Sequence, residues 1–172
     1  SLRRLKLDCI DLYQLHRIDP KVPAAETLGA LKDLQAAGKI RHIGLSEVSV
    51  KEIEQAQKTV RIVSVQNLYN LADQKSAAVL DYCTKHSLGF IPWFPLAAGD
   101  LANPGSPLDQ AAKAHKATVS QLALAWLLQK SPVMLPIPGT SSLKHFEENM
   151  GASGLRLTDK EWAGIAAAAA AA

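Results

Sequence analysis

The sequence predicts an α/β fold built on a parallel sheet, specifically about five β/α units of the eight-stranded (β/α) barrel known as the TIM barrel. Three observations support this class. Short apolar or β-branched runs alternate with amphipathic helical patterns along the chain. These runs are nearly all apolar, as is typical of strands that are covered on both faces. No G-x-G-x-x-G pattern follows any of them, which disfavours a Rossmann dinucleotide fold.

Five segments are predicted as strands because they are short, apolar and bounded by turn or helix signals. They are Cys9–Leu15, Ile40–Leu45, Arg61–Gln66, Gly89–Phe94 and Val133–Ile137. A complete barrel of this type needs about 250 residues. The 172 residues here therefore account for part of one, interpreted as its last five β/α units. The first and last of the five strands would have unpaired edges, which invite pairing with another chain.

Helices are expected after each strand, and two of them have the sequence signature of a capping box. Ser49 is followed by Glu52, and Thr158 by Glu161, each at the spacing that lets the two side chains cap the first turn reciprocally. The other expected helices are residues 26–37, 76–86, 108–115, 118–130 and 142–152. The partial barrel is predicted to span residues 1–165. Seven alanines follow at 166–172, either a helical tail or residues of unassigned side chain, and we assign them no function.

Composition narrows the classes of partner. The net charge of +3 is spread along the chain without a basic block, which argues against nucleic acid and against an anionic membrane surface. No stretch reaches the roughly 18–20 apolar residues of a membrane span, and no secretory signal opens the chain. Cys9 and Cys83 lie in apolar segments and are expected to be reduced core residues. We therefore expect a cytoplasmic protein without a metal site, because no metal-ligand spacing is present.

Polar or aromatic residues end all five predicted strands. Active-site groups of (β/α) barrels lie at the carboxyl ends of the strands, so these residues are the candidates for a site. A lone histidine in such a place is more often an ordinary loop or core residue, and that alternative stays open on position alone. The candidates are His16 with Arg17, Ser46 with Glu47, Gln66 with Asn67, Trp93 with Phe94, and Pro138 to Thr140.

Five stretches in this order resemble motifs of the aldo-keto reductase family. The resemblance covers nearly all of Ser1–Ile165, and the order and spacing make it specific although each motif alone is weak. The stretches are Leu12–His16 (LYQLH), Gly38–Ser46 (GKIRHIGLS), Val65–Asn70 (VQNLYN), the WFPL of Trp93–Leu96, and Pro136–Asn149 (PIPGTSSLKHFEEN).

The resemblance implies NADPH-dependent reduction of an aldehyde or ketone by hydride transfer. His16 would be the catalytic histidine that polarises the substrate carbonyl. Ser46 and Gln66 would hydrogen-bond the nicotinamide carboxamide, and Trp93 would stack on the nicotinamide ring. At Glu47 many members of the family have asparagine, so this sequence departs from the family in that part of the amide contact.

The rest of the NADP(H) site is implied in two segments. Around the pyrophosphate the resemblance places Leu96, Gly99 and Leu101. Around the adenosine 2′-phosphate and the adenine it places Gly139, Thr140, Ser141, His145, Glu148 and Asn149, at the N-terminus of the last barrel helix. Lys144 is the one firm cation in this segment, so the preference for NADP over NAD is expected to be weaker than in relatives with more lysine or arginine.

The tyrosine, lysine and aspartate that complete the family's catalytic tetrad lie on the first three strands, which have no counterpart in this sequence. We therefore expect little reductase activity from these 172 residues alone. One alternative is a non-catalytic barrel fragment that binds nucleotide or completes its open edges with a second copy or a missing N-terminal half. Another is an unrelated barrel enzyme that binds phosphate after its last two strands.

Overall fold

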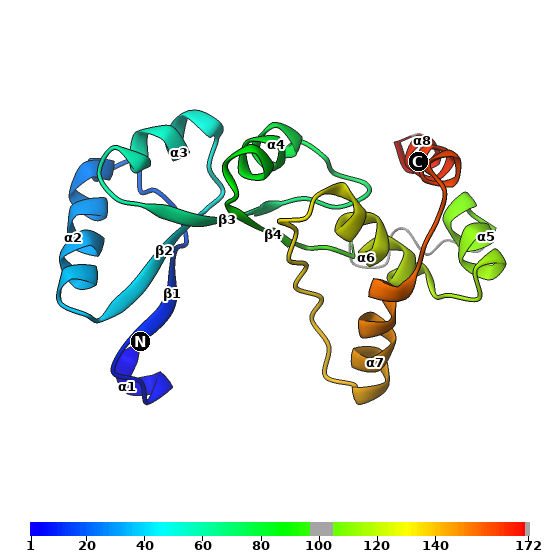
Figure 1. Cartoon of the computed structure of the whole chain (residues 1–172), viewed down its shortest axis with the longest axis horizontal. Helices are drawn as coiled ribbons and strands as arrows, with labels where there is room; N and C mark the ends of the chain where they lie inside the picture. Colours follow the sequence, from blue (N-terminus) through cyan, green and yellow to red (C-terminus); the bar gives the residue numbers. More distant parts are fainter. Residues whose placement is uncertain (97–104, 171–172) are drawn as a thin grey trace. The chain divides into compact units, whose positions relative to one another are not determined.

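The computed structural model describes residues 1–96 and 105–170 (Figure 1). The chain divides into two compact units. The first, unit 1, comprises residues 1–67 and 78–90, and the second, unit 2, comprises residues 68–77 and 91–172. No helix in the described ranges is both long and apolar enough to cross a membrane.

The sheet is parallel and four-stranded, in the order β1-β2-β3-β4. Its strands are β1 (Ile10–Leu15), β2 (Ile40–Ser46), β3 (Ile62–Leu68) and β4 (Gly89–Trp93). Each lies within two residues of the position predicted from sequence. Consecutive strands are neighbours because a helix returns the chain between them, which is the βαβ arrangement that the alternating pattern predicts.

The predicted fifth strand, Val133–Ile137, is wrong. In that segment only Met134 makes an isolated bridge, and the residues that follow have no regular structure. Pro136 and Pro138 explain the difference, because proline has no N–H to donate to a ladder. Leu135 and Ile137 also remain 59% and 44% exposed, so the segment is not buried as a barrel strand would be.

The apolar core of unit 1 lies between the sheet and the helices. Its helices are α1 (Leu2–Leu5), α2 (Ala24–Ala36), α3 (Val50–Gln57) and α4 (Ala77–His86), the last of which begins one residue before the unit resumes. The predicted capping box is confirmed: Ser49 accepts from the Glu52 amide while Glu52 accepts from the Ser49 amide. The fully buried side chains at the centre include those of Ile43, Leu45, Ile53, Val65, Cys83 and Phe90.

The edge of the sheet departs from the prediction that strands are apolar on both faces. Asp11 and Leu12 of β1, and Arg41 and His42 of β2, are exposed. Asp11 and Arg41 form an ion pair across the two strands. β1 has only one neighbour in the sheet, so its first residues are not covered, and charge on such an edge discourages pairing with other chains.

Unit 2 is helical. Its elements are α5 (Pro107–Ala114), α6 (Val119–Lys130), α7 (Leu143–Gly151), the short 3₁₀ helix η2 (Ala152–Gly154) and α8 (Asp159–Ala170). Six consecutive residues of α6, Leu122–Leu127, are buried, so this helix is the centre of the unit. Trp126 stacks on Tyr69 with ring centroids 5.7 Å apart, which confirms that Trp126 is a core residue. The second predicted capping box, Thr158 with Glu161, is also present.

Candidate functional site

The register of the first three strands sorts their side chains onto two faces. Leu15 is level with Leu45, and Leu45 with Val65. Because side chains alternate along a strand, these three share one face, which is apolar. Residues one position earlier or later point to the opposite face. That second face is polar, and the candidates His16, Ser46 and Gln66 lie on it.

Two rungs of the polar face can be followed from strand to strand. In the lower rung, Gln14 is level with Gly44, and Gly44 with Ser64. A Cβ atom at Gly44 would lie 2.4 Å from Ser64 Oγ and 3.1 Å from Gln14 Oε1. The two neighbouring side chains therefore occupy the space that any larger residue would need. Gly44 is the residue in the predicted GKIRHIGLS motif that allows this close approach.

The upper rung contains three of the predicted site residues. Ser46 is level with Gln66, and His16 directly follows Leu15, which is level with Leu45. His16 therefore follows the last residue of β1 beside Ser46, the last residue of β2. Ser46 is buried, Gln66 is half-buried and His16 is exposed. Unit 1 thus brings His16, Ser46 and Gln66 together at the carboxyl edge of its sheet.

Two further side chains contact this rung, the strand-end candidate Arg17 and Gln14, which was not named from the sequence. Arg17 Nη1 donates to the His16 carbonyl at 2.8 Å and to Ser46 Oγ at 3.2 Å. Gln14 Nε2 donates to Gln66 Oε1 at 3.2 Å. Arg17 was a candidate only because it follows a predicted strand, and the sequence assigned it no role. Gln14 was missed, although its place two residues before His16 puts both on the same face.

An open pocket borders the same edge. It has a volume of about 580 Å³ and is lined by residues 13–20, the end of β1 and the loop after it. The stretch includes His16 and Arg17, so both residues line this pocket. A pocket beside a cluster of polar groups at strand ends is the usual form of a binding site in α/β proteins.

The chain turns sharply after β2. Glu47 has a φ of 54°, in the left-handed region that residues with a Cβ rarely adopt, and its amide donates to the Gln66 carbonyl at 2.9 Å. Asn67 is buried and its side chain bonds both the amide and the carbonyl of Val48, at 3.1 and 2.9 Å. Asn67, a strand-end candidate from sequence, therefore holds the loop that follows Ser46. Asparagine tolerates the left-handed region better than glutamate, so Glu47 occupies a strained position.

In unit 2, Trp93 ends β4 and is half-buried. Phe94 follows with a φ of 58° and is 44% exposed. Asn70 holds this turn: its Nδ2 donates to the Phe94 carbonyl at 3.1 Å, while its Oδ1 accepts from the amides of Ala72 and Asp73. Asn70 closes the VQNLYN motif, so the signal that could have identified it was present in the sequence.

The predicted pyrophosphate residues are only partly covered by the structure. Leu96 is half-buried in a turn. Gly99 and Leu101 lie outside the described residues, so their predicted role stays a prediction.

The predicted phosphate segment of unit 2 lies at the start of α7. Gly139, Thr140 and Ser141 are exposed. Ser142 is the N-cap of the helix and accepts from the His145 amide at 3.4 Å. A helix start presents amides without intrahelical acceptors and a partial positive charge, both of which favour an anion. The geometry therefore suits the phosphate that the resemblance places here.

The far end of that segment is tied to α6. Gln121 Nε2 donates to the Glu148 carbonyl at 2.7 Å, a contact that sequence reasoning did not identify. The Glu148 side chain lies 3.8 Å from Lys144 Nζ, so the cation expected at the phosphate shares its charge with a carboxylate one turn away. Asn149 is half-buried beside them. This pairing is a physical reason to expect weakened binding of a 2′-phosphate.

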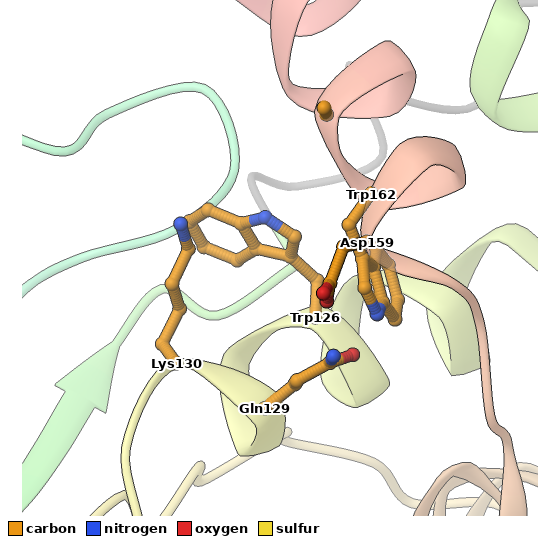
Figure 2. A pocket seen from close by; sticks show the side chains of 6 residues that line it. Trp126, Gln129, Lys130, Asp159 and Trp162 are labelled. Atoms are coloured by element: carbon orange, nitrogen blue, oxygen red, sulfur yellow. The ribbon is translucent and has the colours of Figure 1, made fainter.

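A further pocket of about 320 Å³ in unit 2 contains none of the predicted residues (Figure 2). It is lined by Trp126, Gln129, Lys130, Asp159, Trp162 and Ala163. Lys130 Nζ lies 4.7 Å from the Trp126 ring centroid, a cation–π contact. The buried Trp162 indole N–H has no acceptor within residues 1–96 and 105–170.

Other reactive groups do not add to the candidate site. Burial raises the pKa of the Cys83 thiol to about 12, so this cysteine is a core residue, as expected, and not a nucleophile. Cys9 is also a free thiol but only half-buried. Within the described part of the chain, no three His, Cys, Asp or Glu side chains are grouped so that they could hold a metal ion.

Comparison with known proteins places these features in a family context. A sequence model described as the aldo/keto reductase family matches residues 1–170. An uncharacterized oxidoreductase of Schizosaccharomyces pombe is 51% identical over 163 residues, covering 95% of this chain and 53% of that protein. Pyridoxine 4-dehydrogenase of Escherichia coli is 40% identical over 166 residues, covering 93% of this chain and 58% of that protein. The chain therefore spans little more than half the length of these relatives.

Solved structures agree with the sequence comparison. A thermostable aldo-keto reductase in complex with the inhibitor epalrestat superimposes with a TM-score of 0.90 at 32% identity, covering 96% of this chain and 62% of that one. An aldo/keto reductase from Klebsiella pneumoniae in complex with NADP and acetate gives a TM-score of 0.86 at 34% identity, covering 98% and 62%. The four strands and their helices thus correspond to part of a (β/α) barrel.

Proposed function

Because this chain belongs to the aldo/keto reductase family, we propose that it contributes the nicotinamide and phosphate contacts of an enzyme that reduces an aldehyde or ketone with NADPH. The observation behind the proposal is the polar rung at the carboxyl edge of unit 1, where His16, Ser46 and Gln66 meet beside an open pocket. The substrate would be a small-molecule carbonyl compound, and the cytoplasmic location expected from composition is part of the proposal.

The chemistry of this rung suits a nicotinamide carboxamide. The carboxamide has one carbonyl oxygen that accepts and one NH₂ group that donates. Ser46 has a hydroxyl that can donate, and Gln66 Oε1 keeps a second lone pair beside the one used by Gln14. The two groups are level on adjacent strands. When bound, NADPH supplies the hydride, and the role of Ser46 and Gln66 is to orient its ring.

His16 is proposed to donate a hydrogen bond to the substrate carbonyl oxygen. Its exposed ring borders the pocket of residues 13–20, so a substrate can reach it. A neutral imidazole that donates to the oxygen stabilises the negative charge that develops there as the carbonyl is reduced. The proton that completes the alcohol has to come from another acid, and in the family this is the tetrad tyrosine, which has no counterpart in the 172 residues.

The second half of the cofactor is assigned to unit 2. Trp93 is proposed to stack on the nicotinamide, and Leu96, Gly99 and Leu101 to border the pyrophosphate. The start of α7 offers hydroxyl groups and helix amides to the 2′-phosphate. The residues proposed to contact that phosphate and the adenine are Gly139, Thr140, Ser141, His145, Glu148 and Asn149.

The proposal is tested by cofactor binding, followed by the loss of tryptophan fluorescence. We expect the 172-residue chain to bind NADPH. Ser46→Ala and Gln66→Leu should each weaken that binding by about 3- to 10-fold, and Thr140→Ala should weaken it less. Gln35→Leu, at a half-buried position of α2 whose amide donates to the Arg41 carbonyl, serves as the control. A wild-type chain that binds a sugar phosphate but neither NADPH nor NADP would contradict the proposal and favour an unrelated phosphate-binding barrel enzyme.

We further propose that the chain alone is a poor catalyst. Loss of a general acid lowers the rate by roughly 10²–10⁴-fold. The measurement is NADPH oxidation with a generic aldehyde, compared with a full-length relative. A rate near that of the relative would show that a tyrosine of this chain can act as the acid.

A non-catalytic, self-associating fragment remains a second candidate because unit 2 exposes apolar surface. Leu135, Phe146 and Met150 are 59%, 53% and 61% exposed and line a pocket of about 400 Å³. A second copy or an N-terminal half would cover such a surface. Light scattering after size exclusion distinguishes these cases: a monomer that binds NADPH favours the enzyme, and a dimer that does not bind it favours the fragment.

A further inference from the structure

We propose that Gln14 and Arg17 are positioning residues that make Gln66 Oε1 an acceptor for the nicotinamide carboxamide N–H and the Ser46 hydroxyl a donor to the carboxamide oxygen. The inference rests on the proposed function, because it assigns a role within the same site. Neither residue would touch the substrate or the hydride. Each acts on the residue that touches the carboxamide.

Arg17 sets the direction at Ser46. A guanidinium can only donate, so in the 3.2 Å contact Ser46 Oγ is the acceptor. The hydroxyl hydrogen of Ser46 is then left to donate elsewhere. The same Nη1 atom donates to the His16 carbonyl at 2.8 Å, which anchors the guanidinium to the backbone beside the catalytic histidine. A hydroxyl that would otherwise rotate between donor and acceptor roles is thereby kept as a donor for the carboxamide oxygen.

Gln14 sets the direction at Gln66. Its Nε2 donates to Gln66 Oε1 at 3.2 Å, so the oxygen of Gln66 is turned toward β1 and the polar face. That oxygen has a second lone pair for the N–H of a carboxamide. If the Gln66 amide were reversed, two NH₂ groups would face each other and this acceptor would be lost. Ser46 then presents a donor and Gln66 an acceptor, which matches a primary carboxamide in one orientation only.

Two buried polar atoms beneath the rung support this role for Gln14. Gln14 Oε1 and Ser64 Oγ are both buried, and neither has a hydrogen-bond partner within the described residues. Both lie around Gly44, where an added Cβ would be 3.1 Å from the first and 2.4 Å from the second. A buried amide with one unpaired oxygen is costly to keep. The long-range hydrogen bond of the Gln14 side chain goes to Gln66. We therefore infer that a polar side chain at position 14 orients Gln66 more than it stabilises the fold.

The test uses three ligands that separate the carboxamide from the rest of the cofactor. NADPH has the full amide, the 3-acetylpyridine analogue of NADPH keeps the carbonyl but has no N–H, and adenosine 2′,5′-bisphosphate lacks the nicotinamide. Dissociation constants are measured for the wild-type chain, Gln14→Leu, Gln14→Glu, Arg17→Met and Arg17→Lys. Gln35→Leu and Arg41→Met are the matched controls, because both residues make contacts on the exposed side of unit 1.

We expect Gln14→Leu to weaken the binding of NADPH by about 3- to 10-fold and that of the acetylpyridine analogue by much less. The reason is that only the contact of the carboxamide N–H with Gln66 is lost. Gln14→Glu keeps the shape of the side chain and removes its N–H donor. It should therefore lower the preference for NADPH over the acetylpyridine analogue at least as much. Arg17→Met should weaken both dinucleotides, and Arg17→Lys should recover part of the loss. Adenosine 2′,5′-bisphosphate should bind all variants within about twofold.

The outcomes distinguish the inference from the function beneath it. A wild-type chain that binds none of the three ligands contradicts the proposed function and this inference together. Variants that bind all three like the controls contradict the inference alone. Variants that weaken adenosine 2′,5′-bisphosphate as much as NADPH show a general structural effect, and that result also overturns the positioning role.

Discussion

The candidate residues of unit 1 and of unit 2 are held in two different ways. In unit 1, Gln14 contacts Gln66 across 52 residues of sequence and Arg17 contacts Ser46 across 29. In unit 2, the contacts at the start of α7 run over two or three residues, as between Ser142 and His145, although the far end of the phosphate segment is held by Gln121 across 27 residues. Strand register creates the first site, whereas helix capping creates the second. Substitutions that disturb packing should therefore damage the nicotinamide site more than the phosphate site.

The largest effect is expected at Asn70, which combines both kinds of contact. Asn70→Ala removes two local hydrogen bonds, to Ala72 and Asp73, and a long-range one to the Phe94 carbonyl. Asn70 is 2% exposed, whereas its partners belong to exposed or half-buried residues, so the loss corresponds to about one net hydrogen bond for each of the three contacts. We expect the free energy of unfolding to fall by about 3 kcal/mol, measured by urea denaturation. Asn149→Ala, at a half-buried position on α7, should change it by less than about 0.5 kcal/mol, and equal effects would show that Asn70 does not hold the turn.

The next effect tests the packing of the polar face in unit 1. Gly44→Ala should destabilise the chain by about 2 kcal/mol, since the new Cβ would lie 2.4 Å from Ser64 Oγ. Gly29→Ala on α2 is the matched change, because nothing lies within 4 Å of its added Cβ and alanine favours a helix. It should stabilise by about 0.5–1 kcal/mol. Two changes of the same sign would mean that the close approach at Gly44 is relaxed without cost.

A smaller effect is expected from the local contacts of unit 2. Ser142→Ala removes the N-cap hydrogen bond of α7 and should cost about 0.5–1 kcal/mol. Ser141→Ala, one residue earlier and exposed, should leave stability unchanged within about 0.3 kcal/mol. Thermal unfolding followed by circular dichroism measures both. If Ser142→Ala costs as much as Gly44→Ala, the distinction between locally and distantly held sites fails.

The smallest effect is one of pH and compares the capping boxes of the two units. The Thr158 hydroxyl and amide, and then His115, lower the pKa of Glu161 to about 2. The Ser49 hydroxyl and amide lower the pKa of Glu52 in unit 1. A carboxyl with a depressed pKa stabilises the fold above its unfolded value of 4.5, and this contribution is lost as pH falls toward 2.

Glu161→Gln should therefore reduce the dependence of the urea midpoint on pH between about 4.5 and 2. Glu52→Gln should reduce it less, because Glu52 has no counterpart to the 2.8 Å contact between His115 and Glu161. Both variants should resemble the wild type in slope above pH 5, where the carboxyls are already ionised. A wild-type slope in Glu161→Gln below pH 4 would show that this capping box does not contribute.

Several features of the fold were predictable because they depend on neighbours in sequence. Two helix starts were predicted from capping boxes and are present in the structure, one at Ser49 with Glu52 and the other at Thr158 with Glu161. The bounds of the first four strands were also predicted within two residues, since short apolar runs between helical patterns are typical of buried strands. The family resemblance rested on such local motifs, and the family match over residues 1–170 confirms it.

The error at Val133–Ile137 has a physical cause that was visible in part. An apolar run predicts burial, but Pro136 and Pro138 cannot complete a ladder, and Leu135 is exposed. A strand also needs a neighbour to pair with, and pairing is a property of the whole sheet. Apolarity alone did not determine whether that neighbour was present.

The sequence by itself determined the fold class, the helix starts and the residue types at the strand ends, because propensity, capping and side-chain alternation act over a few residues. Only the tertiary structure decided that Gln14 contacts Gln66, that Arg17 contacts Ser46 and that Gly44 makes room between strands. These contacts depend on which residues become level when three separate strands pair. Register is set by the packing of the opposite, apolar face, so the polar partners cannot be derived from their own positions in the chain.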